Sequence, residues 1–402
     1  MLHVKILTLL SVSFSAACDR SGGGDAFTAT DSSGVVIVEN ARQAWASGAG
    51  WRLSDAPVLS LGAAAGAPEQ EFDRVTDALR MPDGRIVVAN DGSGELRYFA
   101  GDGRFLGSAG GRGEGPGEVR SIARLWPARG DSVIAYDPLL QRITMFAGDG
   151  EPAASVPFRP VPGGGLQQPP EVVGRFPDGS LLARAVPPPP LQAGEGPRRD
   201  SVTYVRLRAG DGLATRLARF PGDESFVVRE GSGVSVYPPI FGRRTYVTVG
   251  GERFYVGSSE AYRIDVFAAD GRLTRSIRLR QAGERVTRAH VDRYRRDYLA
   301  GVEREERPRL ERLLSLLPIP STFPAHGRML VDAEGNLWVA AYPRPGEDLR
   351  HAWNVFDPEG RWLGPVMMPG RFRVTAIGNG MVIGVRRDEQ DVEQVLVYRL
   401  IR

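Results

Sequence analysis

Short apolar runs alternate with tight polar turns along most of the chain. The stretch "YFAGDGRFLG" at 98–107 is one example, similar turns end at Gly150 and Gly212, and others lie within 266–273 and 355–364. Asp-Gly and Gly-rich pairs are typical of tight hairpins because glycine accepts positive φ without strain. The flanking runs are rich in Val, Ile, Phe and Tyr, which favour β-strands. The pattern therefore predicts repeated antiparallel hairpins.

A second turn precedes each of these hairpins, so that each unit reads as four strands. These second turns lie within 80–89, 126–136, 176–184, 249–257 and 331–342, and a sixth lies within 377–385. Four antiparallel strands repeated at intervals of about 40 to 60 residues are typical of a propeller blade. We therefore predict an all-β fold, a six-bladed β-propeller with four-stranded antiparallel blades. The predicted blades span 72–110, 119–158, 170–220, 240–282, 324–367 and 370–402.

The last predicted blade is one strand short, because the chain ends soon after "QVLVYRLI" at 394–401. The segment "WRLSDAPVLSLG" at 51–62 can supply the missing strand. We expect residues 52–61 to hydrogen-bond to the 392–401 region, so that an N-terminal strand joins the last blade and closes the ring. The preceding "GVVIVEN" at 34–40 is a candidate for one further short strand.

Two segments depart from the repeat. The segment 186–200 contains four consecutive prolines, which are excluded from the interior of a sheet. It is predicted to be a long surface loop of the third blade, serving either as a rim contact or as a tolerated insertion. The segment 285–317 has apolar residues at helical spacing, with Thr287 as a candidate N-cap and Pro308 suited to the first turn of a second helix. This small helical hairpin either covers the propeller surface or acts as a lid or partner-binding element.

The glycine-rich segment "GGRGEGPGEV" at 110–119 follows the last strand of the first predicted blade, and a degenerate copy lies at 61–75. The segment resembles the link that precedes an inner strand in the NHL-like six-bladed propeller lipoproteins of bacteria, with Val119 in place of the usual Phe. The resemblance covers 34–402 and implies a propeller fold, but it leaves the biochemistry open. A phosphate-binding loop is the rival interpretation, and the segment lacks the Gly-Lys-Ser/Thr ending of such loops.

The N-terminus carries a pattern typical of secretion. Lys5 precedes twelve apolar or small residues, Ile6–Ala17, a run too short to span a bilayer but suited to a signal peptide. The chain's one cysteine, Cys18, follows directly, and a polar glycine-rich stretch comes next. This arrangement resembles a bacterial lipoprotein signal, although Ser15 stands where that family usually has Leu. Plain secretion with cleavage near Ala17 is the alternative.

The lipoprotein resemblance implies a domain order and a location. It implies a signal peptide over 1–17, lipidation of Cys18, a flexible tether over 18–33 and the propeller over 34–402. We expect the chain in the cell envelope, attached to a membrane on its periplasmic or outer face through the lipid, or secreted. The formal net charge is +3 and acidic residues are spread among the arginines, so that no nucleic-acid partner is expected.

Arginines recur near the ends of the six predicted inner strands. They are Arg74, Arg120, Arg175, Arg243, Arg328 and Arg373. If several of them point to one mouth of the central channel, they form an anion-attracting funnel. The alternative is that an arginine-rich chain places one in each strand by chance.

The sequence indicates no catalytic residue, metal site or cofactor. A metal in the channel would need several histidines or carboxylates, and the predicted inner strands carry few acids. His326 lies near the predicted channel, but a lone histidine is more typical of a structural role. We therefore favour a non-catalytic binding module for a protein, peptide or glycan. The alternatives are a metal-dependent, lactonase-like hydrolase or lyase acting in the channel, and a structural subunit of an envelope complex that docks through the helical hairpin.

Overall fold

The structure is a computed structural model that describes residues 26–62, 67–157, 170–187, 194–208, 214–230, 233–346 and 351–402. Several features singled out in the sequence lie outside these ranges. They are the signal segment, Cys18, the start of the tether, most of the proline run and the turn that ends at Gly212.

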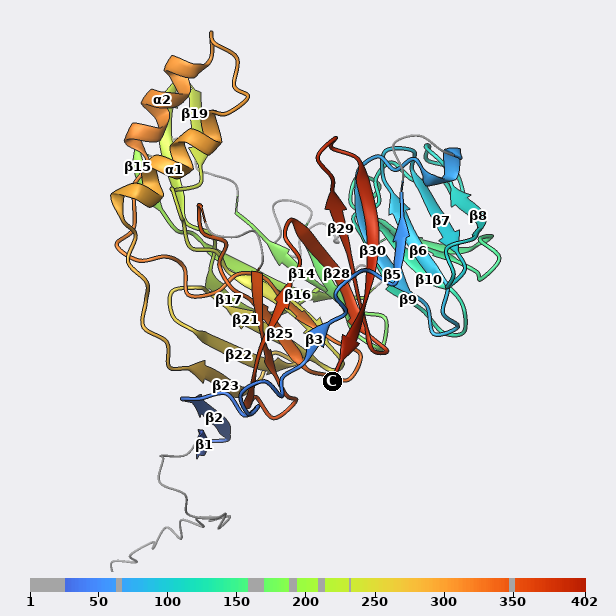
Figure 1. The fold of residues 1–402 in the computed structure, drawn as a ribbon, viewed down its shortest axis with the longest axis horizontal. Helices are drawn as coiled ribbons and strands as arrows, with labels where there is room; N and C mark the ends of the chain where they lie inside the picture. Colours follow the sequence, from blue (N-terminus) through green and yellow to red (C-terminus); the bar gives the residue numbers. More distant parts are fainter. Residues whose placement is uncertain are drawn as a thin grey trace, which may run out of the picture.

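Six sheets of four or more strands account for most of the described chain, and we number them in chain order (Figure 1). Sheet 1 contains β5 (Val75–Arg80), β6 (Ile86–Asn90), β7 (Glu95–Phe99) and β8 (Phe105–Gly110). Sheet 2 contains β9 (Arg124–Pro127), β10 (Val133–Asp137), β11 (Arg142–Phe146) and β12 (Pro152–Pro157). Sheet 3 contains β13 (Glu171–Arg175), β14 (Leu181–Ala185), β16 (Ser201–Leu207) and β17 (Ala214–Pro221).

The remaining three sheets follow the same order of strands. Sheet 4 contains β20 (Tyr246–Gly250), β21 (Arg253–Gly257), β22 (Arg263–Ala268) and β23 (Leu273–Leu279). Sheet 5 contains β24 (Met329–Val331), β25 (Leu337–Ala340), β26 (His351–Phe356) and β27 (Trp362–Met368). Sheet 6 contains β28 (Phe372–Gly378), β29 (Met381–Arg387) and β30 (Glu393–Ile401). The multiple four-stranded antiparallel sheets predicted from the turn pattern are thus confirmed.

The repeated Asp-Gly pairs make one kind of turn. At 102–104, the Asp102 carboxylate accepts the Arg104 backbone N–H at 3.0 Å, and Gly103 adopts a φ of +93°. In the same way, the aspartate carboxylate accepts the backbone N–H two residues later, and the glycine has a positive φ, at four other Asp-Gly pairs. These pairs begin at Asp83, Asp149, Asp178 and Asp270. The aspartate satisfies a backbone donor while the glycine accepts a conformation that a side chain would strain.

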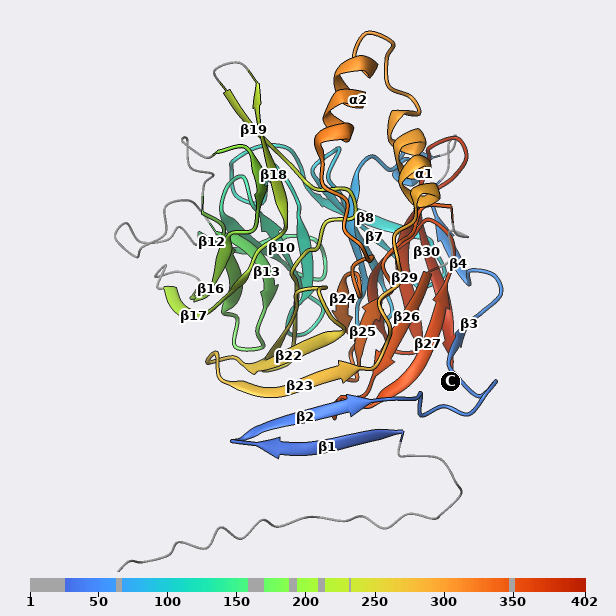
Figure 2. The same ribbon diagram turned by 90° about the vertical axis from the view of Figure 1, so that its left-hand side faces the viewer.

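The N-terminal strands extend two sheets. Strands β3 (Arg52–Leu53) and β4 (Leu59–Leu61) pair antiparallel with β30, so the predicted pairing of 52–61 with the C-terminal strand is confirmed. Strand β2 (Val35–Asn40) instead runs parallel to β23 and enlarges sheet 4, with β1 (Phe27–Ser32) outside it (Figure 2). Residues 27–32 therefore form a strand, where the sequence predicted part of a flexible tether. Pairing with β2 along six residues explains this difference.

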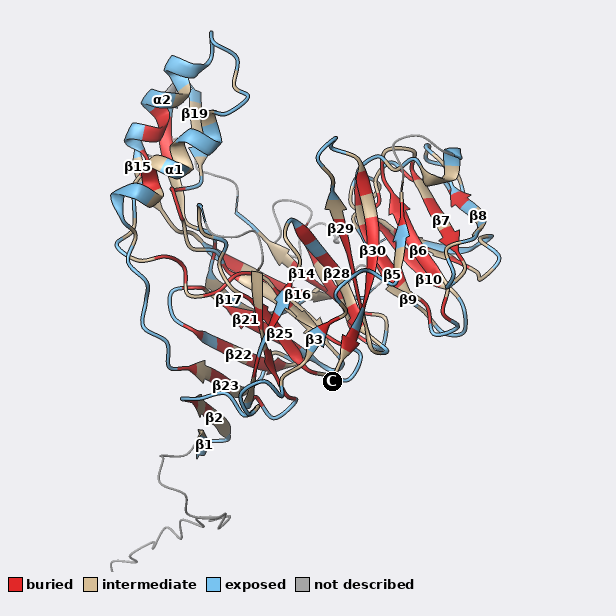
Figure 3. Cartoon of the chain, in the orientation of Figure 1, coloured by how far each residue is buried: buried red, intermediate tan, exposed pale blue. Residues whose placement is uncertain are grey.

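The apolar core lies between neighbouring sheets, as the burial pattern of Figure 3 shows. One buried cluster joins sheets 1 and 2, and others join sheets 2 and 3, 3 and 4, 4 and 5, and 5 and 6. A sixth cluster contains Leu61 of β4, Val75 of β5 and Val395 of β30, and it joins sheet 6 to sheet 1. Each sheet thus buries both of its faces, which a single four-stranded sheet cannot do alone.

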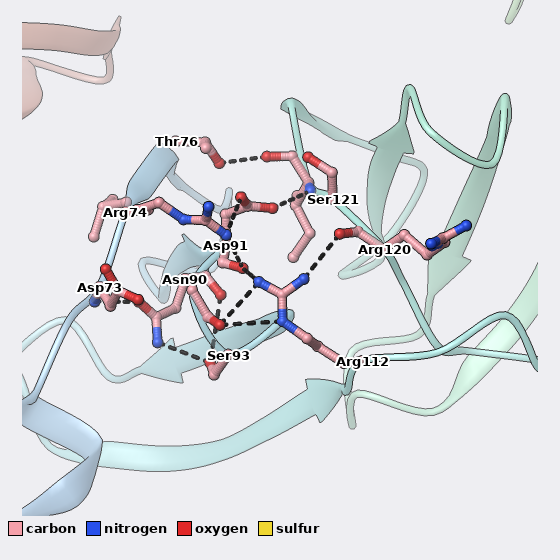
Figure 4. Close-up of polar contacts among 12 residues, drawn as sticks. Asp73, Arg74, Thr76, Asn90, Asp91, Ser93, Arg112, Arg120 and Ser121 are labelled. Carbon is pink, nitrogen blue, oxygen red and sulfur yellow. Dashed lines mark hydrogen bonds and ion pairs between the residues drawn. The ribbon is translucent and has the colours of Figure 1, made fainter.

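The glycine-rich link between sheets 1 and 2 is held by side chains (Figure 4). The Arg112 guanidinium donates to the carbonyls of Asp91, at 2.7 Å, and of Gly92 and Arg120, at 3.0 Å. The Glu118 carboxylate accepts the Gly115 N–H at 2.8 Å. A Cβ on Gly113 would lie 1.9 Å from Glu118 Oε2, so a larger residue there would displace the Glu118 carboxylate. The link is therefore a structural connection.

Two helices and a small sheet project together from the six sheets (Figure 1). Helices α1 (Arg288–Leu299) and α2 (Arg307–Leu316) occupy the predicted helical segment, Thr287 caps α1, and Pro308 lies in the first turn of α2. They pack on a three-stranded sheet of β15 (Gly196–Arg198), β18 (Ser225–Glu230) and β19 (Gly233–Tyr237) through residues such as Val228, Phe241 and Leu314. The repeat pattern of the sequence did not predict this sheet. We call the two helices with this sheet the projecting module.

Candidate functional site

A cavity of about 1030 Å³ lies where the first strands of the six sheets meet. Residues at or beside the start of β5, β9, β13, β20, β24 and β28 line it. In chain order they are Arg74, Arg124, Glu171, Tyr246, Arg328 and Arg373. We call this space the central cavity. A second hollow of about 520 Å³ lies against the opposite ends of five of these strands, and its lining is mainly apolar.

Three of the six arginines singled out in the sequence line the central cavity, namely Arg74, Arg328 and Arg373. Arg120 lies in the link before β9 and pairs with Glu114 at 3.2 Å. Arg175 ends β13 and lines a separate pocket, and Arg243 pairs with Glu224 in another. The structure therefore brings together three of the predicted residues and leaves the other three outside the cavity.

Arg124, the first residue of β9, is a cavity residue that the sequence pattern did not predict. Its side chain lines the cavity and is exposed, and it has no hydrogen-bond or ion-pair partner in the part of the chain that the structure describes. The signal that could have found it is its place at the start of an inner strand. The sequence predicted that this strand starts near Val119, whereas the link continues to Ala123. Within the link, the Ile122 N–H donates a hydrogen bond to the Asp91 carboxylate.

Backbone carbonyls fix two arginines of the cavity, the half-buried Arg328 and the more exposed Arg373. Arg373 donates to the carbonyls of Thr76, at 2.9 Å, and Val75, at 2.5 Å. Arg328 donates to the carbonyl of Val374, and its guanidinium lies over the Trp353 ring at 5.2 Å from the centroid. Neither guanidinium has an ion pair among the described residues, so both charges remain available to a ligand.

The electrostatics of the site reflect crowded positive charge. Burial, then repulsion from Arg373 and Arg124, lowers the pKa of Arg328 to about 10. Burial also lowers the pKa of Arg373, although Asp77 and Glu393 oppose this effect. Arg328 still carries its charge at neutral pH, but it is poorly compensated. A bound anion would compensate this charge, as expected for a site that is prepared for one.

Acidic side chains near the cavity are already engaged. Asp77 is buried, accepts the Leu125 and Ala78 N–H groups at 3.0 Å, and has a pKa raised mainly by that burial. Glu171 pairs with Arg184 at 2.8 Å. Glu393 pairs with Arg387 at 3.0 Å and accepts the Val75 N–H at 2.6 Å. The described residues contain no group of three or more His, Cys, Asp or Glu side chains that could hold a metal ion.

His326 has a structural environment. Its ring is fully buried, Nε2 accepts the Ser259 N–H at 3.2 Å, and Nδ1 donates to the Gly327 carbonyl at 2.9 Å. Burial lowers the pKa of His326 to about 4, so the ring is neutral at pH 7. It does not line the central cavity.

Comparison with known proteins gives structural likenesses without a family assignment. No protein-family model and no curated protein matches the chain. A member of the DUF4221 family from Bacteroides vulgatus is 8% identical over 88% of this chain and 99% of its own, with a TM-score of 0.49. A virginiamycin B lyase from Staphylococcus aureus is 10% identical over 88% and 100%, with a TM-score of 0.40. A gluconolactonase from Xanthomonas campestris is 13% identical over 87% and 100%, with a TM-score of 0.40.

Neither of the two helices in the described ranges is long and apolar enough to cross a membrane.

Proposed function

We propose that the six sheets are the blades of a six-bladed propeller whose ring is closed by β3 and β4 on β30. Two observations support this arrangement. Buried clusters join every pair of consecutive sheets, including the last to the first. The first strands of all six sheets border one central cavity.

We further propose that the protein is a non-catalytic binding module of the cell envelope that takes an anionic group into the central cavity. The observation that carries this proposal is the convergence of Arg124, Arg328 and Arg373 without an ion-pair partner for any of them among the described residues. The cavity lining contains six arginines and two glutamates, a net charge of +4. Guanidinium groups bind planar carboxylate or phosphate oxygens through paired hydrogen bonds, and a concave site strengthens their field.

The two alternative functions rest on less. A metal-dependent hydrolase or lyase needs converging ligands, and the carboxylates that line the cavity are instead held by arginines. A docking role for the projecting module has support in its exposed apolar side chains, among them Leu316, which is 57% exposed, and Tyr298, which is 45% exposed.

The binding proposal is tested with inorganic phosphate as the probe and calorimetry as the readout, at constant ionic strength. Arg124→Gln is the informative variant, because Arg124 is exposed and holds no structural bond in the described part of the chain. We expect it to weaken phosphate binding about tenfold or more, as for the loss of a charge-assisted hydrogen bond. Arg104→Gln, at an exposed arginine on a distant turn, is the matched control. Equal binding by wild type and Arg124→Gln would refute the assignment of the site.

The location in the envelope and the lipid on Cys18 also remain proposals, supported by the signal pattern. Mass spectrometry of the N-terminal peptide from membranes tests them. An acylated Cys18 is expected, and an unmodified N-terminus after Ala17 would instead indicate plain secretion.

A further inference from the structure

The positive charge of the central cavity continues on the surface to either side. At one edge of the cavity lies Arg74, and Arg120 lies next to the lining residue Ser121; their side chains are each 56% exposed although each has one carboxylate partner (Figure 4). On the other side lies Arg244, which is exposed and has no ion pair among the described residues. A small anion would need only the cavity, so the flanking arginines point to a longer ligand with repeated negative charges.

Arg244 also connects the cavity to the projecting module. It directly precedes the two cavity-lining residues Thr245 and Tyr246. Three residues earlier, the Phe241 ring packs against the Tyr294 ring of α1, with ring centroids 5.3 Å apart. The foot of the projecting module therefore borders the same mouth, and a chain-like ligand leaving the cavity would meet tyrosine rings and a guanidinium there.

Unpaired polar groups of a particular kind line the cavity beside the arginines. The side chains of Ser121, Gln141 and Tyr246 make no hydrogen bond within the described ranges. Hydroxyl and amide groups can both donate and accept hydrogen bonds. Sugar hydroxyls have the same dual character, and a partly exposed tyrosine ring offers an apolar face to the C–H side of a sugar. The combination with unpaired guanidinium groups fits a sugar ring that carries a carboxylate.

We propose that the ligand of the central cavity is an acidic glycan, a chain of carboxylate-bearing sugars. One carboxylate lies among Arg124, Arg328 and Arg373, and the neighbouring sugars extend toward Arg74 and Arg244. This proposal rests on the proposed anion-binding function and adds the class of ligand. An extended acidic peptide is the competing ligand. It carries equal charge but lacks the hydroxyls that would use Ser121, Gln141 and Tyr246.

The test compares four probes by calorimetry on the purified full chain at constant ionic strength. They are tetragalacturonate, its fully methyl-esterified form, tetraglutamate and inorganic phosphate. We expect tetragalacturonate to bind most tightly. We expect the ester, which keeps the sugar chain but loses the charges, to bind at least tenfold more weakly. Tetraglutamate, which matches the charge without the hydroxyls, is expected to be weaker than tetragalacturonate.

Two variants separate the glycan contacts from the anion contacts. Tyr246→Phe removes only a hydroxyl, and Arg244→Gln removes a charge outside the cavity. Each is expected to weaken tetragalacturonate binding about two- to tenfold, since one hydrogen bond of moderate strength is lost. Arg244→Gln is expected to leave phosphate binding unchanged, because Arg244 lies outside the cavity lining. Circular dichroism and the thermal midpoint establish that each variant is folded, and Arg104→Gln again serves as the control.

The outcomes distinguish the two proposals. If phosphate binds and tetragalacturonate does not, the ligand class is wrong and the anion-binding function stands. If neither anion binds, both proposals fail. Tetraglutamate binding as tightly as tetragalacturonate would overturn the glycan in favour of an acidic peptide, and equal binding of the ester would remove the role given to the carboxylates.

Discussion

The buried His326 predicts a defined loss of stability in acid. Its ring is sealed between the Tyr246 and Tyr262 rings, with centroids 5.9 and 5.6 Å away, and Gly257 leaves the space that the ring fills. Both ring nitrogens are hydrogen-bonded only in the neutral form, because Nε2 must keep its lone pair to accept the hydrogen bond from the Ser259 N–H. Protonation would place an unpaired charge in this site and break that bond.

The magnitude follows from the pKa. The ordinary pKa of 6.5 falls to about 4 in the folded protein. Because each tenfold change in an equilibrium is worth about 1.4 kcal/mol, this difference corresponds to about 3 kcal/mol. The folded-state pKa is the lower one, so this stability is complete above pH 6.5. It is lost as the pH falls from 6.5 to about 4, where the unfolded chain binds the additional proton.

The assay is urea unfolding from pH 7.5 to pH 4 for the wild type and for His326→Gln. Glutamine can keep one donor and one acceptor but does not titrate. We expect the wild type to lose about 3 kcal/mol more than the variant over this range, although carboxylates contribute to both curves. The matched control is His290→Gln, which removes a half-buried histidine and puts a residue favoured in capping boxes at the N3 position of α1. If wild type and His326→Gln show parallel pH profiles, the burial argument is refuted.

Two further predictions concern the ends of the fold. Leu61→Ala, at a side chain that is 1% exposed between sheets 6 and 1, is expected to lower the free energy of unfolding by about 2–5 kcal/mol in urea titration. Val58→Ala, at a 47% exposed residue nearby, should change it by less than about 0.5 kcal/mol, and equal losses would contradict the closure of the ring. Leu314→Ala, at a 2% exposed side chain, is expected to speed amide hydrogen exchange in the projecting module while exchange in the six sheets stays unchanged. Leu316→Ala, at a 57% exposed position on the same helix, is the control, and faster exchange in all sheets would show that the module does not unfold separately.

Local chemistry made much of the fold predictable from the sequence. The Asp-Gly turns could be recognised because a carboxylate bond and a positive φ are properties of the residues themselves. The need for a strand from 51–62 followed from counting strands in the last unit. By contrast, the pairing of β2 with β23 could not be predicted, since it depends on where the chain runs after β1 and β2 and not on their composition.

The small sheet of the projecting module was missed for a related reason. Strand β15 lies within the loop that the prolines indicated, and its partner β18 comes after the third sheet is complete. Neither segment has a repeat to mark it. Burial against α1 and α2, through residues such as Val228 and Leu313, stabilises the short strands, and this contact exists only in three dimensions.

The candidate site shows what decides which arginines converge. Arg74 and Arg328 each precede the first residue of an inner strand by one position, Arg124 is that first residue, and Arg373 follows it by one. Arg120 and Arg243 lie three or four positions before their strands begin, and Arg175 lies at a strand's far end. Equivalent ends of the first strands of the six sheets border one cavity, so the position of an arginine relative to the strand start decides whether it lines that cavity. Composition alone cannot identify the arginines that line the cavity, because an arginine occurs near nearly every one of these strands. Because β9 starts at Arg124, an unpaired guanidinium lies at the cavity. The proposed anion site therefore depends on where this one strand begins.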